Sequence, residues 1–304
     1  MKSTKVLARR WLIAFAMLLG VALTLVLLWP SPLMPALACD AASDGHVLAT
    51  TDFSQVPPQV VEDARNLAEI YYPKDEAKAN DMMSQLVGTY LAAADKDFVV
   101  IFNPGGWGWD PISEIPGWES IMHGIEETLG GFGYKTLLVD YKRTRHGFDG
   151  IVGETEVLLG IQRAKAEELA ARVTFLTQHL PNLCVILTGE SNGAIIADDA
   201  LRLLRENPRV FAIETGPPVW HPSLEFERSL VIKNNGEQPD TFSNGDIILI
   251  MRSNIESAFG IHSGVQGNIL LYIGAPGHFY SWDYPAVRAQ VVDFLTTKFS
   301  PAPK

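Results

Sequence analysis

The chain alternates between short apolar runs and amphipathic stretches over most of its length. Six runs rich in apolar residues are typical of buried strands: 97–103, 135–141, 183–189, 209–215, 229–235 and 268–274. The segments between and after them repeat apolar residues at helical spacing, and the clearest are 118–133, 154–180, 194–207 and 286–299. This order of strands and helices predicts an α/β fold with a mostly parallel central sheet and helices on both faces.

The region before the first strand follows another pattern. Residues 58–72 and 75–95 carry apolar side chains at helical spacing, so two helices are expected within 58–95. Residues 31–57 are rich in Pro, Ala, Ser and Asp and show no periodicity, which is typical of a linker. We therefore expect one folded domain over 58–304, with the two helices leading into it.

Residues 1–30 predict a membrane segment. The run 11–29 contains no charged residue, and as a helix its 19 residues would reach roughly 28 Å, close to the thickness of a bilayer core. Four cations precede it, at Lys2, Lys5, Arg9 and Arg10, and would keep the N-terminus in the cytoplasm. A single-pass signal anchor is expected, with the domain on the non-cytoplasmic side; cleavage near 36–39 would instead release a secreted protein.

Composition narrows the function classes. The chain has 24 basic and 35 acidic residues, and every acidic residue follows Cys39, so nucleic acid is not an expected partner. Cys39 falls in the linker and Cys184 in a predicted strand, and neither has a metal-binding spacing with a histidine. No dinucleotide fingerprint, phosphate-binding loop or HExxH string occurs, so no cofactor and no metal are expected.

The string GESNG at 189–193 places Ser191 between two glycines, directly after a predicted strand and before a predicted helix. A turn this sharp strains the central residue and crowds the positions two before and two after it, where glycine avoids a collision. The serine hydroxyl is then exposed at the sheet edge, beside a helix N-terminus that favours developing negative charge. This strand, serine turn and helix resemble the nucleophile elbow of the α/β-hydrolase superfamily, with Ser191 as the nucleophile.

The resemblance implies a histidine base after the last strand and an acid after the strand before it. His278 lies in the loop after the last predicted strand, followed by the terminal helix that the fold requires. Asp240 is the favoured acid and Asp246 its rival, although Asp246 also fits the first turn of a capped helix over 243–260. Weaker candidates for the acid are Glu214, Glu237 and Asp283.

The same resemblance implies an oxyanion hole. One donor would be the backbone amide of Asn192, and the other would come from the glycine-rich loop after the first strand, at Gly106 or Trp107. Trp107 and Trp109 would wall a substrate pocket or pack against the leading helices. The basic cluster at 142–146 would meet an anionic substrate group or simply be solvated.

These features predict a membrane-tethered serine hydrolase that cleaves carboxylic esters, lipid-like or small and apolar, through an acyl-enzyme. The expected partners are the ester substrate and the membrane. Two alternatives stay open: an acyltransferase on the same fold, and a non-catalytic binding module with a hydrolase fold.

Overall fold

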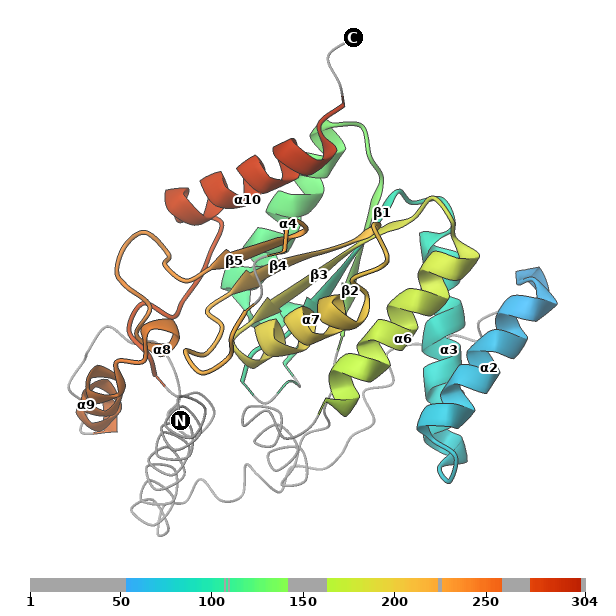
Figure 1. Cartoon of the computed structure of the whole chain (residues 1–304), viewed down its shortest axis with the longest axis horizontal. Coiled ribbons are helices and arrows are strands. Elements are labelled where there is room, and N and C mark those ends of the chain that lie inside the picture. The colour runs from blue at the N-terminus through green and yellow to red at the C-terminus, as the bar shows by residue number, and fades with distance from the viewer. Residues whose placement is uncertain are drawn as a thin grey trace, which may run out of the picture.

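A parallel sheet forms the centre of the molecule (Figure 1). The computed structural model describes residues 53–106, 108, 110–141, 163–223, 226–258 and 274–301. Its strands are β1 (Phe98–Asn103), β2 (Thr136–Asp140), β3 (Cys184–Glu190), β4 (Val210–Thr215) and β5 (Ser229–Ile232). They lie in the order β2-β1-β3-β4-β5, and each adjacent pair is parallel. The α/β class and the first five strands are confirmed, while the sixth, predicted over 268–274, lies almost entirely outside the described residues.

Helices cover both faces of the sheet, as the sequence predicts. One face packs on α6 (Ala164–His179) and α7 (Asn192–Leu203), and the other on α4 (Pro116–Gly131) and α10 (Pro285–Phe299). Alternate strand residues divide between the two cores: Val99 and Val185 lie on the α6–α7 side, and Val100 and Ile186 on the α4–α10 side. Both strand faces are therefore buried, which explains why these segments are almost wholly apolar.

The two leading helices form an outer layer. They are α2 (Pro58–Tyr71) and α3 (Glu76–Ala93), preceded by a short 3-10 turn, η2 (Phe53–Gln55). They pack on each other and on α6, at the side of the molecule away from α10 (Figure 1). Within the described ranges no helix has both the length and the apolar character needed to cross a bilayer. The predicted membrane segment, 11–29, and most of the predicted linker lie outside those ranges.

One predicted helix is divided in two. In place of a single helix over 243–260, the chain forms α8 (Thr241–Asn244) and then α9 (Ile247–Ala258). Gly245 separates them, since it adopts a left-handed conformation with φ 73° that ends α8. The expectation that Ser243 and Asp246 share one first turn was wrong: Ser243 belongs to α8, and Asp246 precedes α9.

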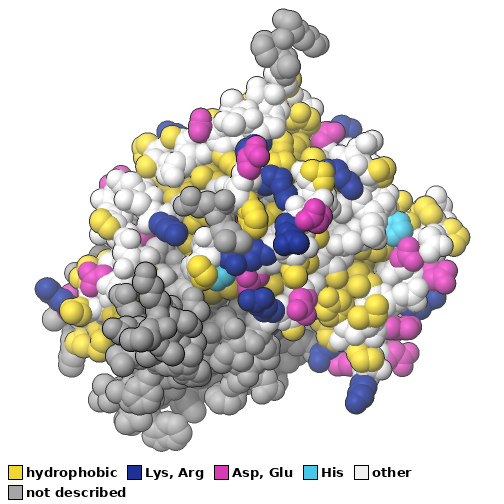
Figure 2. Space-filling model, viewed as in Figure 1, with side chains coloured by type: hydrophobic (Ala, Val, Ile, Leu, Met, Phe, Trp, Pro, Cys, Tyr) yellow, Lys and Arg dark blue, Asp and Glu magenta, His cyan; other side chains and the backbone are white. Residues whose placement is uncertain are grey.

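Basic side chains gather over α7 and the neighbouring elements on one face of the molecule (Figure 2). Two arginines near β4 hold loops by donating to backbone carbonyls. Arg209 donates to Leu180 at 3.0 Å, and Arg228 donates to Asn207 at 2.6 Å. These cations therefore fasten the connections around β4 to its neighbours.

The strand order predicts where a ligand-binding site would lie on the sheet. The chain leaves β1 toward β2 on one side, and β3 lies on the other side of β1, so the order of strands reverses there. Ligands in open parallel sheets bind at the carboxyl ends of the strands beside such a reversal. Asn103 at the end of β1 is in register with Gly189 near the end of β3. Ser191 is the first residue after β3.

Candidate active site

Ser191 is the single residue between β3 and α7. Its backbone has φ 54° and ψ −115°, and it is the only non-glycine residue with positive φ in the described part of the chain. Its N–H donates to Thr215 O at 3.0 Å, which holds the turn against the end of β4. Because a strained conformation costs on the order of 1–3 kcal/mol, the surrounding structure must hold this residue in place.

The two glycines of the turn are required for different reasons. A Cβ on Gly189 would lie 2.4 Å from the backbone of Gly193, which is the collision that the sequence predicts across the turn. A Cβ on Gly193 would lie 2.0 Å from Asn103 O, at the end of β1. The second glycine therefore allows α7 to approach the loop after β1, a contact that the motif alone does not reveal.

Asp240 and His278 are brought together although 38 positions separate them. His278 Nδ1 lies 2.9 Å from Asp240 Oδ2, and the Asp240 side chain is fully buried. An ionised carboxylate can only accept a hydrogen bond, so Nδ1 carries the proton and donates it. The Nε2 atom of the neutral ring is then the basic nitrogen.

The imidazole packs close to the residue that holds the Ser191 turn. A Cβ on Gly216 would be 2.5 Å from His278 Cε1 and 3.1 Å from Asp240 Oδ2, so the pair packs directly on Gly216. Gly216 follows Thr215, whose carbonyl accepts the Ser191 N–H. The His278–Asp240 pair therefore lies at the carboxyl end of β4, next to the residue to which Ser191 is bonded.

Burial and the charges nearby shift the pKa values of His278 and Asp240. Burial alone would lower the pKa of His278, but the hydrogen bond to Asp240 and its negative charge raise that pKa above the ordinary value. Burial opposes ionisation of Asp240, yet the hydrogen bond and charge of His278 lower the pKa of this carboxyl. The pair is therefore arranged to stabilise a protonated imidazole beside an ionised acid.

Neutral donors surround Asp240. The hydroxyl of the fully buried Tyr280 donates to Oδ2 at 2.6 Å, and Ser243 Oγ lies 3.0 Å from the same atom. Oδ1 accepts from the backbone N–H groups of Phe242 and Ser243 and so caps α8. Sequence reasoning missed both side chains, and the one available signal was the position of Tyr280 two residues after His278.

The proposed oxyanion donors lie close to the turn. Asn192 is the first residue of α7, so its backbone N–H has no acceptor within the helix. Its side-chain Nδ2 donates to Gly106 O at 3.0 Å and ties the loop after β1 to the start of α7. A Cβ on Gly105 would lie 3.4 Å from Ser191 Cβ, so this loop borders the serine. Trp107 and Trp109 lie outside the described residues.

Glu190 adds a second carboxyl group, which sequence reasoning also missed. It ends β3, and its Oε2 would be 3.4 Å from a Cβ on Gly105. Burial raises the pKa of Glu190 to about 7, the positive charge of His278 acts against this shift, and the negative charge of Asp240 adds to it. The signal available in the sequence was the position of Glu190 in GESNG, directly before the proposed nucleophile Ser191.

The rival acids lie elsewhere. Asp246 Oδ1 accepts the N–H of Leu249 at 3.0 Å and caps α9, the structural role that the sequence allowed. Glu237 and Asp283 are exposed, and Glu214 is buried in the sheet. Of the Asp240 and Asp246 pair considered from sequence, Asp240 is therefore the one that contacts His278.

Three other histidines lie within the described residues, and each has an acidic neighbour of its own. His123 on α4 lies 3.4 Å from Glu126, and His179 on α6 lies 3.2 Å from Asp63. His221 lies 2.7 Å from Asp198. The basic cluster at 142–146 and His262 fall outside the described residues.

Comparison with known proteins adds little to these observations. No family model matches the chain, and no curated protein does. Among solved structures it is similar to Trichoderma reesei cutinase in complex with a C11Y4 phosphonate inhibitor, at 14% identity and a TM-score of 0.37. That match covers 80% of this chain and 94% of the cutinase chain. A likeness this distant says nothing of which residues act here.

Proposed function

We propose that this protein is a serine hydrolase of the α/β-hydrolase type that cleaves carboxylic esters through a Ser191–His278–Asp240 triad. One arrangement carries the proposal. The strained Ser191 between β3 and α7 donates its N–H to Thr215, and the next residue, Gly216, packs against His278, whose Nδ1 lies 2.9 Å from the buried Asp240. A strained non-glycine residue is costly to maintain and is concentrated at functional sites. The order serine, acid, histidine along the chain is also that of α/β-hydrolases.

In the proposed reaction, Ser191 Oγ attacks the ester carbonyl carbon while His278 Nε2 takes the hydroxyl proton. Asp240 holds the ring so that Nδ1 is protonated and stabilises the imidazolium that forms. The backbone N–H of Asn192 would donate to the oxyanion, together with an N–H of the loop held by the Asn192 side chain. His278 then protonates the leaving alcohol, and the acyl group remains on Ser191.

Water completes the cycle by the reverse sequence of proton transfers. It attacks the acyl carbon while His278 Nε2 takes its proton, and the C–O bond to Ser191 breaks. The proton returns to Ser191 Oγ and a carboxylic acid is released. The net change is one ester and one water converted to one acid and one alcohol, with no cofactor consumed.

Apolar esters are the proposed substrate class. Phe279 follows His278 and is half exposed, and Val219, which contacts Gly245 near α8, is 43% exposed. On α9, Ile248 is 82% exposed. Exposed apolar side chains next to His278 and around α8 and α9 favour an apolar acyl or alcohol group over a charged one.

We further propose that residues 11–29 tether the enzyme to a membrane, with the domain on the non-cytoplasmic side. The support is the uncharged run and the four preceding cations. Fractionation of cells that express the chain would test it. Retention of the protein in the membrane pellet after carbonate washing is expected, and recovery in the soluble fraction would contradict the tether.

Hydrolysis of a chain-length series of p-nitrophenyl esters tests the main proposal. The wild type should release p-nitrophenol, with a preference for apolar acyl chains, and Ser191→Ala should lose about 10⁴-fold or more in kcat/KM. Ser84→Ala, on α3 away from the triad, is the matched control and should keep full activity. Equal activity of Ser191→Ala and wild type would overturn the proposed role of Ser191.

A further inference from the structure

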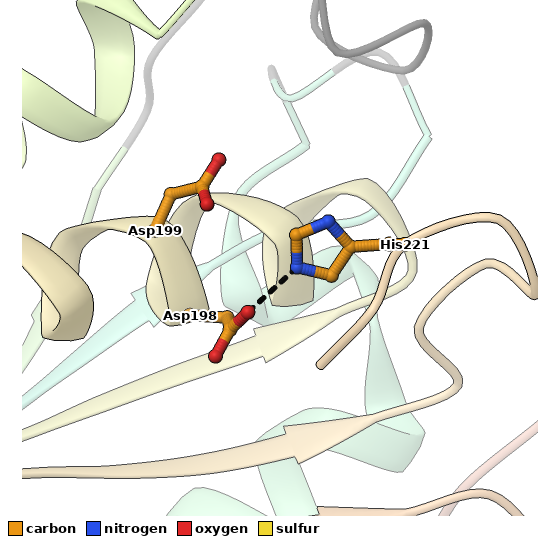
Figure 3. Close-up of side chains that lie close together, drawn as sticks. All are labelled: Asp198, Asp199 and His221. Atoms are coloured by element: carbon orange, nitrogen blue, oxygen red, sulfur yellow. Dashed lines mark hydrogen bonds and ion pairs between the residues drawn. The ribbon is translucent and has the colours of Figure 1, made fainter. Parts of the chain in front are cut away.

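A second group of ionisable side chains lies on α7 and on the loop after β4. Asp198 and Asp199 come from α7, and His221 comes from the loop after β4 (Figure 3). One ligand atom from each of the three lies within 4.8 Å of the others. Carboxylate oxygen and imidazole nitrogen at this separation are a donor set that first-row divalent metals accept.

The group is buried rather than a solvated acidic surface. The Asp198 side chain is fully buried, His221 is 10% exposed and Asp199 18% exposed. His221 Nε2 lies 2.7 Å from Asp198 Oδ2, and Arg202 donates to that oxygen through Nε at 3.0 Å and Nη2 at 2.6 Å. Asp198 therefore has partners, and they include one permanent cation.

Glu214 supplies an independent observation. It is fully buried, and neither of its carboxyl oxygens has a hydrogen-bond partner. Its strand neighbour on the same face, Ala212, packs in the core with Ile196 and Ala197 of α7, so the Glu214 side chain is directed at α7. Burial raises the pKa of Glu214 well above its usual range, and the charge of Asp198 is the next cause. A buried carboxyl group without a hydrogen-bond partner is costly, so this side of α7 lacks a polar or cationic partner for Glu214 within the described ranges.

Arg202 contacts Asp198 at 2.6 Å and Asp199 at 3.6 Å, whereas the Glu214 carboxyl group has no hydrogen-bond partner among the described residues. We propose that Asp198, Asp199 and His221 bind a divalent transition-metal ion of the zinc type, with Glu214 as the buried carboxylate behind it. This would be a structural site, separate from the hydrolytic one.

Binding would require a change of tautomer. If His221 Nε2 donates to Asp198 in the metal-free state, the ring proton must lie on Nδ1 before Nε2 can ligate, and the imidazole stays neutral throughout. Arg202 keeps Asp198 as a partner, and water would complete the coordination. The metal would join α7 to the loop that runs from Gly216 to His221, and Gly216 is the residue on which His278 packs.

The imidazole of His221 favours a transition metal such as zinc over calcium or magnesium. Calcium and magnesium prefer oxygen ligands only, whereas zinc binds His nitrogen together with carboxylate oxygen. The pattern escaped the sequence reading because Asp198 and His221 are 23 positions apart and lie in no recognised metal motif. Calcium is therefore the informative control ion.

Zinc binding to the full-length, tag-free chain in detergent tests the proposal, by metal analysis after dialysis and by calorimetric titration. Wild type should bind one zinc per chain and show a higher unfolding temperature with zinc but not with calcium. His221→Ala and Asp199→Asn should each lose at least about tenfold in zinc affinity and the zinc-dependent shift. His123→Ala, an exposed histidine on α4, should match wild type.

Two results would contradict the zinc site. If wild type binds no zinc, or if both cluster variants bind it as wild type does, the site does not exist. Asp199→Asn keeps the proposal testable should His221→Ala fail to fold, because Asp199 is partly exposed and its replacement keeps the side-chain volume.

Discussion

Two of the histidine–aspartate pairs in the described residues have a fully buried aspartate, and their first contact is almost the same. His278 lies 2.9 Å from Asp240, and His221 lies 2.7 Å from Asp198; both aspartates are fully buried. The pairs differ in the nitrogen used, which is Nδ1 in His278 and Nε2 in His221. They differ also in what else holds the acid.

Asp240 is held by neutral donors, the Tyr280 hydroxyl among them, so its charge is available to stabilise an imidazolium. Asp198 is already neutralised by Arg202 through two nitrogen atoms. The first pair also packs on Gly216, next to the residue that accepts the Ser191 N–H. The comparison teaches that a histidine–aspartate contact alone identifies neither a catalytic base nor a metal ligand, because the neighbours of the acid decide its role.

Replacement of each histidine should separate the pairs most strongly. His278→Ala should lower kcat/KM for p-nitrophenyl esters by about 10⁴-fold, because Ser191 loses its base. His221→Ala should cause a far smaller loss while it weakens zinc binding. Steady-state kinetics on both folded variants provides the measurement, and equal losses would refute the distinction between the pairs.

Replacement of the acids should give the next largest effect. Asp240→Asn should lower kcat by about 10³- to 10⁴-fold, since an amide no longer fixes the protonated Nδ1 of His278. Asp246→Asn should keep activity, because asparagine can also cap α9. Far-UV circular dichroism should confirm that both variants fold, and an inactive Asp246→Asn beside an active Asp240→Asn would reverse the assignment of the acid.

Tyr280→Phe should have a moderate effect. It removes the hydroxyl that donates to Asp240 at 2.6 Å, a hydrogen bond to a charged group worth about 1.5–3 kcal/mol. The free energy of unfolding should fall by that order, and kcat should fall while KM changes little. Urea denaturation and kinetics measure the two effects; an unchanged unfolding free energy would show that this contact contributes nothing.

Glu190→Gln should give the smallest effect, visible in the pH profile. Activity requires neutral His278, so kcat/KM should rise with pH through the pKa of His278, which is raised above its ordinary value. The charge of Glu190 raises the pKa of His278, and its removal should move the acid limb to lower pH. A limb that stays in place, or moves upward, would contradict an interaction between the two groups.

Most of the described sheet could be predicted because each strand is buried on both faces and its apolar run is unmistakable. β5 is the exception, since it was expected over 229–235 and ends at Ile232. Asn234 leaves the sheet there to form an isolated antiparallel bridge with Pro239. The division of α8 from α9 was also missed, because Gly245 adopts a left-handed conformation that ends α8 after a single turn.

The candidate site was only partly accessible from sequence. Ser191 and His278 could be chosen from a local motif and from chain order, whereas Asp240 required knowledge of which loop reaches the imidazole. Tyr280 and Glu190 were marked only by their places in the chain, two residues after His278 and directly before Ser191. Their proximity to Asp240 and His278 arises from tertiary packing, which one sequence does not encode in any fixed spacing.

The most direct test of the central claim is the site of covalent modification by a fluorophosphonate. An activated Ser191 should displace fluoride and form an O–P bond, so mass spectrometry of digested wild type should find the adduct on the peptide that contains residue 191. Labelling should vanish in Ser191→Ala and become much slower in His278→Ala. A folded wild-type protein that stays unmodified, or carries the adduct on another serine, would contradict the assignment of Ser191 as the nucleophile.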